Sequence, residues 1–251
     1  MQKPRALVCG ASEGIGRASA IALSQKGFAV SLLARSKPRL EELAATLPGA
    51  TVIVADLDDR PALVKALENA VSHGPYYALV NNTGGPHGGP LLEASEEALL
   101  AAFSRNVLAG QILVRAVLPG MIAAGHGRIV NVLSTSLREP IANLGIGNTI
   151  RGAMAGWSKT LANELPPGIT INNVLPGYTK TARLMELADL AATRTGKSRE
   201  TVLSEWAKMA PEQRLAEPEE IANVIAFLCS PEASFIRGQS LAADGGRIRA
   251  I

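Results

Sequence analysis

Three glycines near the start of the chain are spaced so that the backbone could approach a phosphate group. They follow a short apolar run and precede a helical pattern. Gly10 permits a tight turn, Gly14 a close approach to a pyrophosphate, and Gly16 close helix–strand packing. The N–H groups and dipole at the start of a helix attract phosphate. This context favours a dinucleotide site over a simple strand–helix turn. The expected contact residues are Gly10, Ser12, Gly14, Ile15 and Gly16.

Arg35 stands at the end of the second predicted strand, where the nucleotide is selected. A carboxylate there would bind the ribose 2′-OH of NAD and repel a 2′-phosphate. This chain instead has Arg35, with Lys37 close behind. A guanidinium can bind a phosphate through two hydrogen bonds and stack on adenine. We therefore predict that NADP(H) is preferred, with NAD(H) as the alternative nucleotide and a solvated surface arginine as the alternative role of Arg35.

A sheet must position these residues, because short strand-like runs alternate with helical segments along the whole chain. Strands are predicted at 5–9, 29–33, 51–55, 78–80, 128–133, 169–174 and 240–243, and helices at 15–26, 62–72, 96–123, 151–165 and 218–229. Apolar strands that alternate with helices predict a parallel sheet covered on both faces. Right-handed crossovers give an α/β, doubly wound, Rossmann-type domain with seven parallel strands. Its ligands bind beyond the carboxyl ends of the strands.

Length and composition indicate the class of protein. The chain has 251 residues, 47% hydrophobic and 19% charged, so we expect one soluble domain over residues 1–251. The net charge is +3, the basic residues are dispersed and aromatic residues are 4%, which suits an anionic small molecule and disfavours nucleic acid. We expect no membrane span, since charges such as Arg105 and Arg115 interrupt the apolar runs. No metal-ligand spacing is present in the sequence.

The two cysteines indicate a reducing compartment. Cys9 lies in a predicted buried strand and Cys229 in a predicted helix, so we interpret both as packing thiols. The first strand begins almost at the N-terminus, which leaves no room for a signal peptide. We therefore expect a cytoplasmic protein.

Ordered motifs along nearly the whole chain resemble those of the short-chain dehydrogenase/reductase family. The glycine turn has the spacing Gly-x-x-x-Gly-x-Gly, and Asn-Asn-Thr-Gly at 81–84 resembles the family's Asn-Asn-Ala-Gly motif. Segment 129–134 looks like the strand that ends in the active-site serine, and segment 238–246 looks like the C-terminal strand region. The general resemblance is to the 3-oxoacyl-carrier-protein-reductase-like branch. It implies an oxidoreductase of a carbonyl or alcohol group, a 3-oxoacyl-type substrate among the candidates, and a homotetramer.

The resemblance also implies roles for individual residues. Ser134 would bind the substrate oxygen, Asn106 would hold a structural water, and Asp56 would contact adenine. The further cofactor contacts that it implies are Asn82, Gly84, Pro176, Gly177 and Thr181. In the homotetramer, helices 96–123 and 151–165 would pack across one two-fold interface, with the C-terminal strand region near another.

The family's tyrosine and lysine are missing from this chain. The spacing from Ser134 and the downstream segment 155–165 both align the proton-donating tyrosine with Gly147 and the ribose-binding lysine with Arg151. Segment 134–158 contains no tyrosine or lysine, so no shift of register restores the pair. Glycine has no proton to donate, whereas arginine keeps its charge and could hold the nicotinamide ribose.

Two functions remain consistent with the sequence. The first is an atypical NADP(H)-dependent oxidoreductase that keeps Ser134, Arg151 and Asn106 as catalytic positions. The alternative is a catalytically silent NADP(H)-binding regulatory or sensor protein. The loss of one general acid typically costs about 10²–10⁴-fold in rate, which hydride transfer could survive. Water, His87 or Tyr178 could carry the proton, although His87 could equally be an exposed loop residue and Tyr178 a wall of the pocket.

Segment 181–210 is the candidate substrate lid, since it is rich in Ala, Leu and Met and stands where the family carries one. Its large apolar side chains could cover a substrate or serve ordinary helix packing. They are Leu184, Met185, Leu187, Leu203, Trp206 and Met209.

Overall fold

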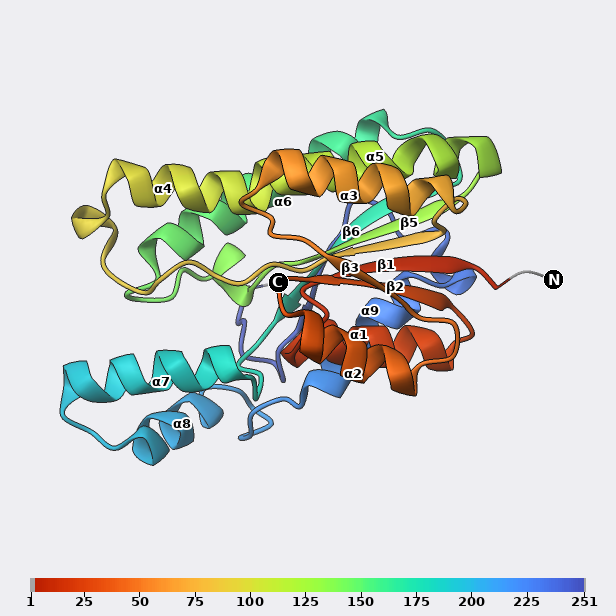
Figure 1. The fold of residues 1–251 in the computed structure, drawn as a ribbon. Helices are drawn as coiled ribbons and strands as arrows, with labels where there is room; N and C mark the ends of the chain where they lie inside the picture. Colours follow the sequence, from red (N-terminus) through yellow and green to blue (C-terminus); the bar gives the residue numbers. More distant parts are fainter. Residues whose placement is uncertain (1–2, 251) are drawn as a thin grey trace.

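Seven parallel strands form one sheet in the computed structural model, which describes residues 3–250 (Figure 1). The strands are β1 (Arg5–Cys9), β2 (Ala29–Ala34), β3 (Thr51–Val54), β4 (Ala78–Asn81), β5 (Gly127–Val132), β6 (Ile169–Pro176) and β7 (Ser240–Ala243). Their order in the sheet is β3-β2-β1-β4-β5-β6-β7. The order reverses between β1 and β4, which is where such sheets bind ligands. The predicted Rossmann-type, single-domain fold is confirmed.

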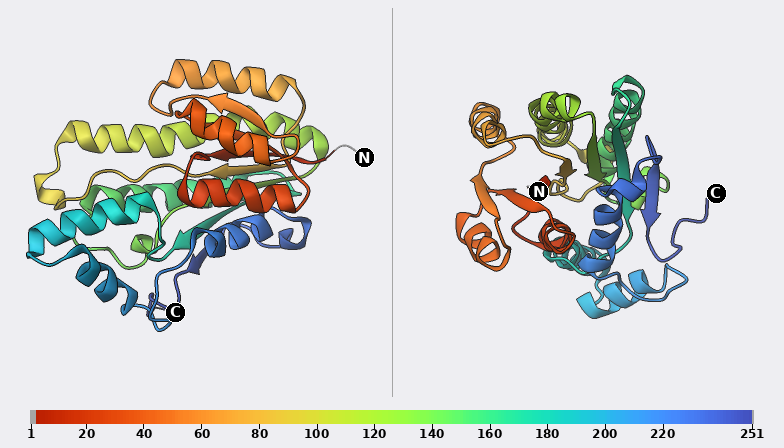
Figure 2. Two further views of the ribbon diagram at one scale, coloured as in Figure 1. Left: turned by 60° about the horizontal axis from the view of Figure 1, so that its bottom comes forward. Right: turned by 90° about the vertical axis from the view of Figure 1, so that its right-hand side faces the viewer.

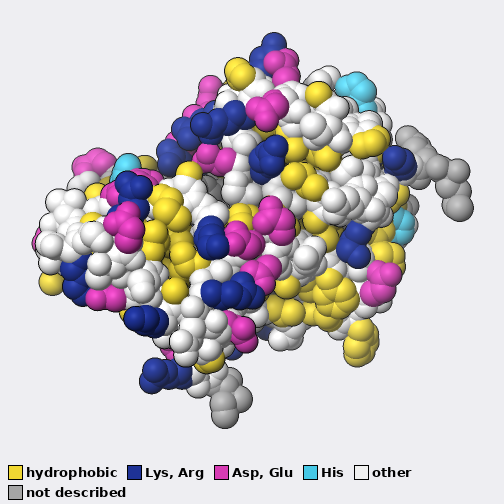
Figure 3. All heavy atoms as spheres, turned by 90° about the horizontal axis from the view of Figure 1, so that it is seen from below, with side chains coloured by type: hydrophobic (Ala, Val, Ile, Leu, Met, Phe, Trp, Pro, Cys, Tyr) yellow, Lys and Arg dark blue, Asp and Glu magenta, His cyan; other side chains and the backbone are white. Residues whose placement is uncertain are grey.

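Helices cover both faces of the sheet (Figures 1 and 2). One face carries α3 (Arg60–Ser72), α4 (Glu96–Phe103), α5 (Ala109–Ala124) and α6 (Gly145–Glu164). The other face carries α1 (Gly14–Gln25), α2 (Lys37–Thr46) and α9 (Pro218–Leu228). Helices α7 (Ala182–Thr195) and α8 (Arg199–Ala207) project beyond the sheet. Acidic and basic side chains are interspersed on the face seen from below, as the dispersed charges of the sequence suggest (Figure 3).

The two faces of the sheet bury separate apolar cores, because successive side chains of a strand point to opposite sides. Leu7 of β1 packs in the core beneath α3 and α5. Its neighbour Val8 packs in the core formed with α1 and α9. Both residues are fully buried, which explains the continuous apolar run at this strand.

The predicted strands are all present, with ends that differ by one or two residues. The larger difference is α6, which begins at Gly145 rather than at Arg151. Segment 145–150 contains two glycines and an asparagine, which have low helix propensity. Packing in the folded protein stabilises this first turn of α6 instead. Ile150 and Met154 belong to one apolar cluster, and Ile146 packs against it. Gly147 therefore lies in the first turn of α6.

Helices α4 and α5 join through a π-helical turn, Ser104–Leu108, into one helical segment over 96–124. This segment is long and apolar enough to cross a membrane by length and composition alone, so the expectation that charges interrupt every such run is wrong here. Core helices pass the same test. In this fold Leu113 and Val117 of α5 are buried in the core beneath the helix, which is the packing of a core helix.

Both cysteines are buried and unpaired. Burial raises the pKa of the Cys9 thiol and that of the Cys229 thiol to about 12. The prediction that they are packing residues is confirmed, because both side chains lie fully buried in the apolar cores of the sheet.

Candidate functional site

A cleft of about 470 Å³ opens at the carboxyl ends of the strands. Its walls come from the segments after β1 to β6 and from the first turns of α6 and α7. Sites for small molecules and cofactors typically have about 300–1,000 Å³, so the cleft is large enough for one. The predicted site residues that line it are Gly10, Ser12, Gly14, Ile15, Arg35, Asp56, Asn82, Gly84, Ser134, Arg151, Pro176, Gly177 and Thr181.

The glycine turn after β1 depends on its glycines. Gly10 has a φ of 62°, a left-handed conformation that side chains disfavour. A Cβ on Gly16 would collide with the carbonyl oxygen of Gly10, so a glycine at position 16 is needed for α1 to pack closely against the turn. Glu13, which precedes α1, makes no side-chain hydrogen bond to the first turn of the helix. The N–H groups of that turn can therefore bind an anion.

These features fit a dinucleotide cofactor. Gly10, Gly14 and the start of α1 would hold its pyrophosphate, and Thr181 stands opposite them. The position that a Cβ would take on Gly14 is 3.1 Å from Cγ2 of Thr181. A larger residue at position 14 would therefore fill the space between the turn and α7.

Basic side chains gather where the adenosine end of the cofactor is expected. The Arg35 side chain is 72% exposed, and its Nη1 lies 4.0 Å from Oδ2 of Asp56. An exposed pair at this distance is weak and leaves Arg35 able to bind a phosphate. Arg39 of α2 lies in the same part of the cleft, where it forms a 2.6 Å ion pair with Glu13. Sequence reasoning missed this pair, which joins residues that only the fold brings together.

Asparagine side chains link neighbouring strands of the sheet close to the cleft. Nδ2 of Asn81 donates to Oδ1 of Asn131 at 3.2 Å. Asn131 in turn donates to Oδ1 of Asn173 at 2.9 Å. Asn82, which lines the cleft, donates to the carbonyl oxygen of Cys9 at 3.3 Å. These amides link β1, β4, β5 and β6 across the sheet and so help to hold the segments that carry the site.

Ser134 lies directly after β5 and faces the cleft. Its Oγ accepts a hydrogen bond from the backbone N–H of Ser136 at 3.1 Å. This contact uses a lone pair, so the hydroxyl proton is available to a ligand oxygen.

Asn106 lies behind the cleft, in the π-helical turn. Its Oδ1 accepts from the Thr83 hydroxyl at 2.6 Å, and its Nδ2 donates to the carbonyl oxygen of Ala102 at 2.9 Å. Thr83 itself lines the cleft. The side chain of Asn106 therefore positions Thr83, and its proposed role with a water stays a prediction.

Gly147 faces the cleft from the first turn of α6. A Cβ at this position would be 3.8 Å from Cγ of Pro86 and 3.9 Å from Cβ of Leu144, which are ordinary contacts. The local backbone therefore does not require glycine. No hydroxyl donor reaches the cleft from position 147.

Arg151 lies one turn further along α6. Its Nη1 donates to the carbonyl oxygen of Val132 at 3.2 Å, which fastens α6 to the end of β5. Burial, and then the neighbouring Arg183 guanidinium, lower the pKa of Arg151 to about 10. Arg151 is therefore positively charged at neutral pH and presents charge to the cleft without shuttling protons.

The other candidate proton donors differ in placement. His87 is exposed and lines the cleft. Tyr178 stacks on Trp206 with ring centroids 4.8 Å apart, and burial raises the pKa of its phenol. Tyr178 therefore forms a wall. Asn148, a polar neighbour of Gly147, is held by the backbone of Ile141 through both of its amide atoms, so it fixes a loop.

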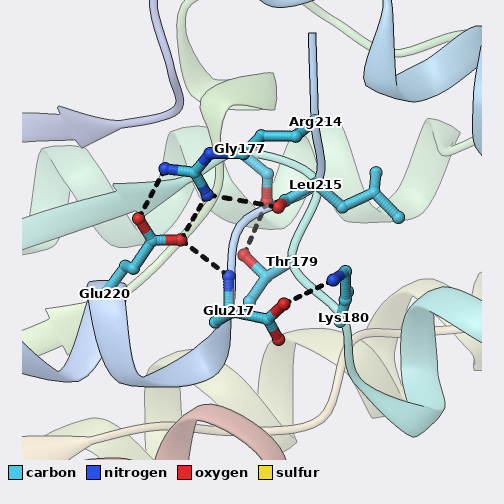
Figure 4. A network of polar contacts seen from close by, with 7 residues as sticks. All are labelled: Gly177, Thr179, Lys180, Arg214, Leu215, Glu217 and Glu220. Atoms are coloured by element: carbon cyan, nitrogen blue, oxygen red, sulfur yellow. Dashed lines mark hydrogen bonds and ion pairs between the residues drawn. The ribbon is translucent and has the colours of Figure 1, made fainter. Parts of the chain in front are cut away.

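A network of polar contacts connects the segment that precedes α7 with the segment that follows α8 (Figure 4). Arg214 makes two bonds to the Glu220 carboxylate, at 2.6 and 2.7 Å. Lys180 pairs with Glu217, and the Thr179 hydroxyl donates to the carbonyl oxygen of Gly177. The network joins segment 177–180, which leaves the sheet, to segment 214–220, which returns to it.

The apolar residues of the candidate lid divide between the two predicted roles. Leu184 and Leu187 line the cleft and can cover a substrate. Leu203 and Trp206 pack with Ala188 in a cluster between α7 and α8. Met209 is 49% exposed. Within the candidate lid, the start of α7 therefore contributes the apolar side chains that line the cleft.

Arg183 is the main cleft residue that sequence reasoning missed. It lies in the first turn of α7, donates to the carbonyl oxygen of Pro86, and forms a 2.7 Å ion pair with Glu186. It therefore bridges α7 and the loop after β4. No motif identifies this bridge, because it depends on how two distant segments meet.

Comparison with known proteins extends the similarity over nearly the whole chain. A family model described as "Enoyl-(Acyl carrier protein) reductase" matches residues 10–247. The chain is 33% identical to 2-keto-3-deoxy-L-fuconate dehydrogenase of Xanthomonas campestris, over 98% of this chain and 80% of the relative. It is 30% identical to the NADPH-dependent reductase BacG of Bacillus subtilis, over 100% of both. L-sorbose reductase from Gluconobacter frateurii, solved with NADPH and L-sorbose, matches with a TM-score of 0.92 and 30% identity, over 100% of this chain and 98% of that one.

Proposed function

The chain belongs to the short-chain dehydrogenase/reductase family of NAD(P)-dependent oxidoreductases of carbonyl and alcohol groups, and we propose that it is an NADP(H)-dependent member with a non-standard active site. The observation that carries the proposal is one cleft that holds the glycine turn, Ser134 and Arg151 together. A 3-oxoacyl-type compound is one candidate substrate.

The preference for NADP(H) is supported by charge at the adenosine end. Arg35 is exposed and weakly paired, so it can turn towards a 2′-phosphate. Arg39 adds a second guanidinium nearby, although Glu13 partly neutralises it. The relatives BacG and L-sorbose reductase are described with NADPH, which agrees with this assignment.

The chemistry divides between the cofactor and the residues of the chain. When bound, the nicotinamide supplies or accepts a hydride. Ser134 donates a hydrogen bond from its hydroxyl to the substrate oxygen, and Arg151 places a fixed positive charge in the same cleft. Both groups stabilise negative charge that develops on the substrate oxygen. Since position 147 offers no acid, water in the cleft or His87 carries the proton.

The alternative is a catalytically silent NADP(H)-binding regulatory or sensor protein. The absence of a hydroxyl at Gly147 and of a titratable amine at position 151 favours it. The silent protein would bind NADPH normally and turn over no carbonyl or alcohol.

A turnover screen separates the two functions. NADPH absorbance is followed with a panel of ketones, sugar ketones and 3-oxoacyl thioesters, and the reverse reaction with NADP⁺ and alcohols. We expect turnover of at least one compound, and a loss of about 10²–10³-fold in Ser134→Ala with NADPH affinity retained. Ser204→Ala, on the exposed face of α8, is the control. Tight NADPH binding without turnover would favour the silent protein.

We also propose a cytoplasmic homotetramer. Apolar side chains of the α4–α5 segment are exposed in the single chain, as an interface helix would have them. They are Leu100, Phe103, Leu108 and Ile122. Phe235, near β7, is fully exposed as well and suits a second interface.

A further inference from the structure

Two arginines converge on one side of the loop after β4. The position that a Cβ would take on Gly85 is 3.8 Å from Nε of Arg183 and 4.0 Å from its Nη2. The same position is 4.0 Å from Nη2 of Arg151. The Nε–Nη2 edge of Arg183 therefore faces the same point as the Arg151 guanidinium. Nη2 already donates one of its two hydrogens to the carbonyl oxygen of Pro86, which leaves the other hydrogen and Nε–H for a ligand.

Carboxylates of the protein balance this positive charge only in part. The acidic residues that line the cleft, Glu13 and Asp56, lie at the adenosine end. Arg151 donates to a neutral carbonyl oxygen, and Arg183 pairs with Glu186, whose side chain is 50% exposed. The like charges repel each other, which helps to lower the pKa of Arg151. An anion bound between them would relieve this repulsion.

One donor of Arg183 is unused. Its Nε is buried and has no hydrogen-bond partner among residues 3–250. A buried charged donor without a partner costs free energy, which an acceptor from a ligand removes. The loop that shields Nε contains Gly84, Gly85, Gly88 and Gly89, so a small movement can admit a ligand oxygen.

The position of Arg183 points to the substrate rather than to the cofactor's pyrophosphate. Arg183 donates to the carbonyl oxygen of Pro86, whose ring lies 3.8 Å from the Cβ position of Gly147. The resemblance to the family aligns position 147 with the tyrosine that would touch the substrate oxygen. The glycine of the pyrophosphate turn, Gly14, faces Thr181 instead.

We propose that Arg183, with Arg151 beside it, binds a carboxylate of the substrate. This inference rests on the oxidoreductase function proposed above and narrows its substrate class to oxo acids and the corresponding hydroxy acids. A guanidinium matches a carboxylate through two parallel, charge-assisted hydrogen bonds. A neutral ketone or an amide offers no charge to either arginine.

The test uses the full chain saturated with NADP⁺. Two oxo acids, 2-oxopentanoate and 4-oxopentanoate, and their primary amides are titrated by calorimetry, which needs no turnover. We expect at least one acid to bind about tenfold or more tightly than its amide. Equal affinity of acid and amide for both pairs would overturn the proposal. A chain that fails to bind NADP⁺ in the first titration would instead contradict the proposed function.

Variants assign the effect to Arg183. We expect Arg183→Gln to reduce the affinity for the acid to that for the amide, with NADP⁺ affinity within about twofold of wild type. Arg194→Gln, an exposed arginine on the same helix, is the matched control and should change neither affinity. An Arg183→Gln variant that keeps the acid affinity would overturn the proposal, and so would one whose NADP⁺ affinity falls by about tenfold, since the arginine would then serve the pyrophosphate. If Arg183→Gln does not fold, the acid–amide comparison on the wild type decides.

Discussion

Gly147→Tyr combined with Arg151→Lys should raise activity on carbonyl substrates, because the pair supplies a general acid and its pKa-lowering partner. The backbone at position 147 can accept a side chain. Gly147 has a helical backbone, and the nearest atoms to its Cβ position, in Pro86 and Leu144, are 3.8 and 3.9 Å away. The change costs no backbone strain there, and replacing a helical glycine stabilises by about 0.5–1 kcal/mol.

The lysine has a cost of similar size. Arg151→Lys removes the 3.2 Å hydrogen bond to Val132, which is worth about 0.5–1.5 kcal/mol in a typical protein. The two changes therefore nearly cancel in stability, and the double variant should fold. A positioned general acid contributes about 10²–10⁴-fold in rate, which sets the expected gain in kcat/KM. Since the two groups act as a unit, the gain should exceed the product of the single variants.

The assay measures initial rates of NADPH consumption, after calorimetry has shown that NADPH affinity is retained. The control is Gly152→Tyr with Arg151→Lys. Gly152 is the next residue of α6, is exposed, and has no atom within 4 Å of its Cβ position. A folded, NADPH-binding double variant with no gain over this control would refute the idea that the missing acid limits the site.

Three further outcomes are expected. Arg35→Asp should weaken NADPH and favour NADH through repulsion of the 2′-phosphate; calorimetry that finds NADPH affinity unchanged would remove Arg35 from the site. Cys9 and Cys229, whose thiol pKa burial raises to about 12, should resist iodoacetamide in the native protein at about pH 8 and react in urea, and fast native labelling by mass spectrometry would contradict their burial. Light scattering at micromolar concentration should give the mass of four chains, and a stable monomer would contradict the tetramer.

The fold could be predicted because its signals are local. Residues 6–9 of the first strand form a continuous apolar run, and the spacing of Gly10, Gly14 and Gly16 indicates a tight backbone turn directly. The start of α6 could not be predicted, since the sequence from Gly145 to Ile150 disfavours a helix and its packing in the fold decides.

The sequence predicts a site residue only where the position of that residue in the fold depends on its own segment alone. Ser134 follows a strand, so the topology alone brings it to the cleft. The ion pair of Arg39 with Glu13 and the bridge from Arg183 to Pro86 each need two segments in contact. A lone arginine in a sequence does not indicate which segment it will reach, because its long side chain can take many directions.

The pH dependence of turnover should show which group supplies the proton in a site that has glycine at position 147. A lysine at position 151 would have no tyrosine whose pKa it could lower. Arginine instead keeps a positive charge and a hydrogen bond to Val132 at any pH near neutrality. With Ser134 holding the substrate oxygen and water taking the proton role, kcat/KM should stay nearly flat from about pH 6 to 9, since Arg151 stays protonated over this range even with its pKa lowered to about 10. His87→Gln tests the alternative that His87 carries the proton, because the variant would then lose activity while it keeps its NADPH affinity. A flat profile in both proteins supports water, whereas an inflection that survives His87→Gln would mean that another group supplies the proton.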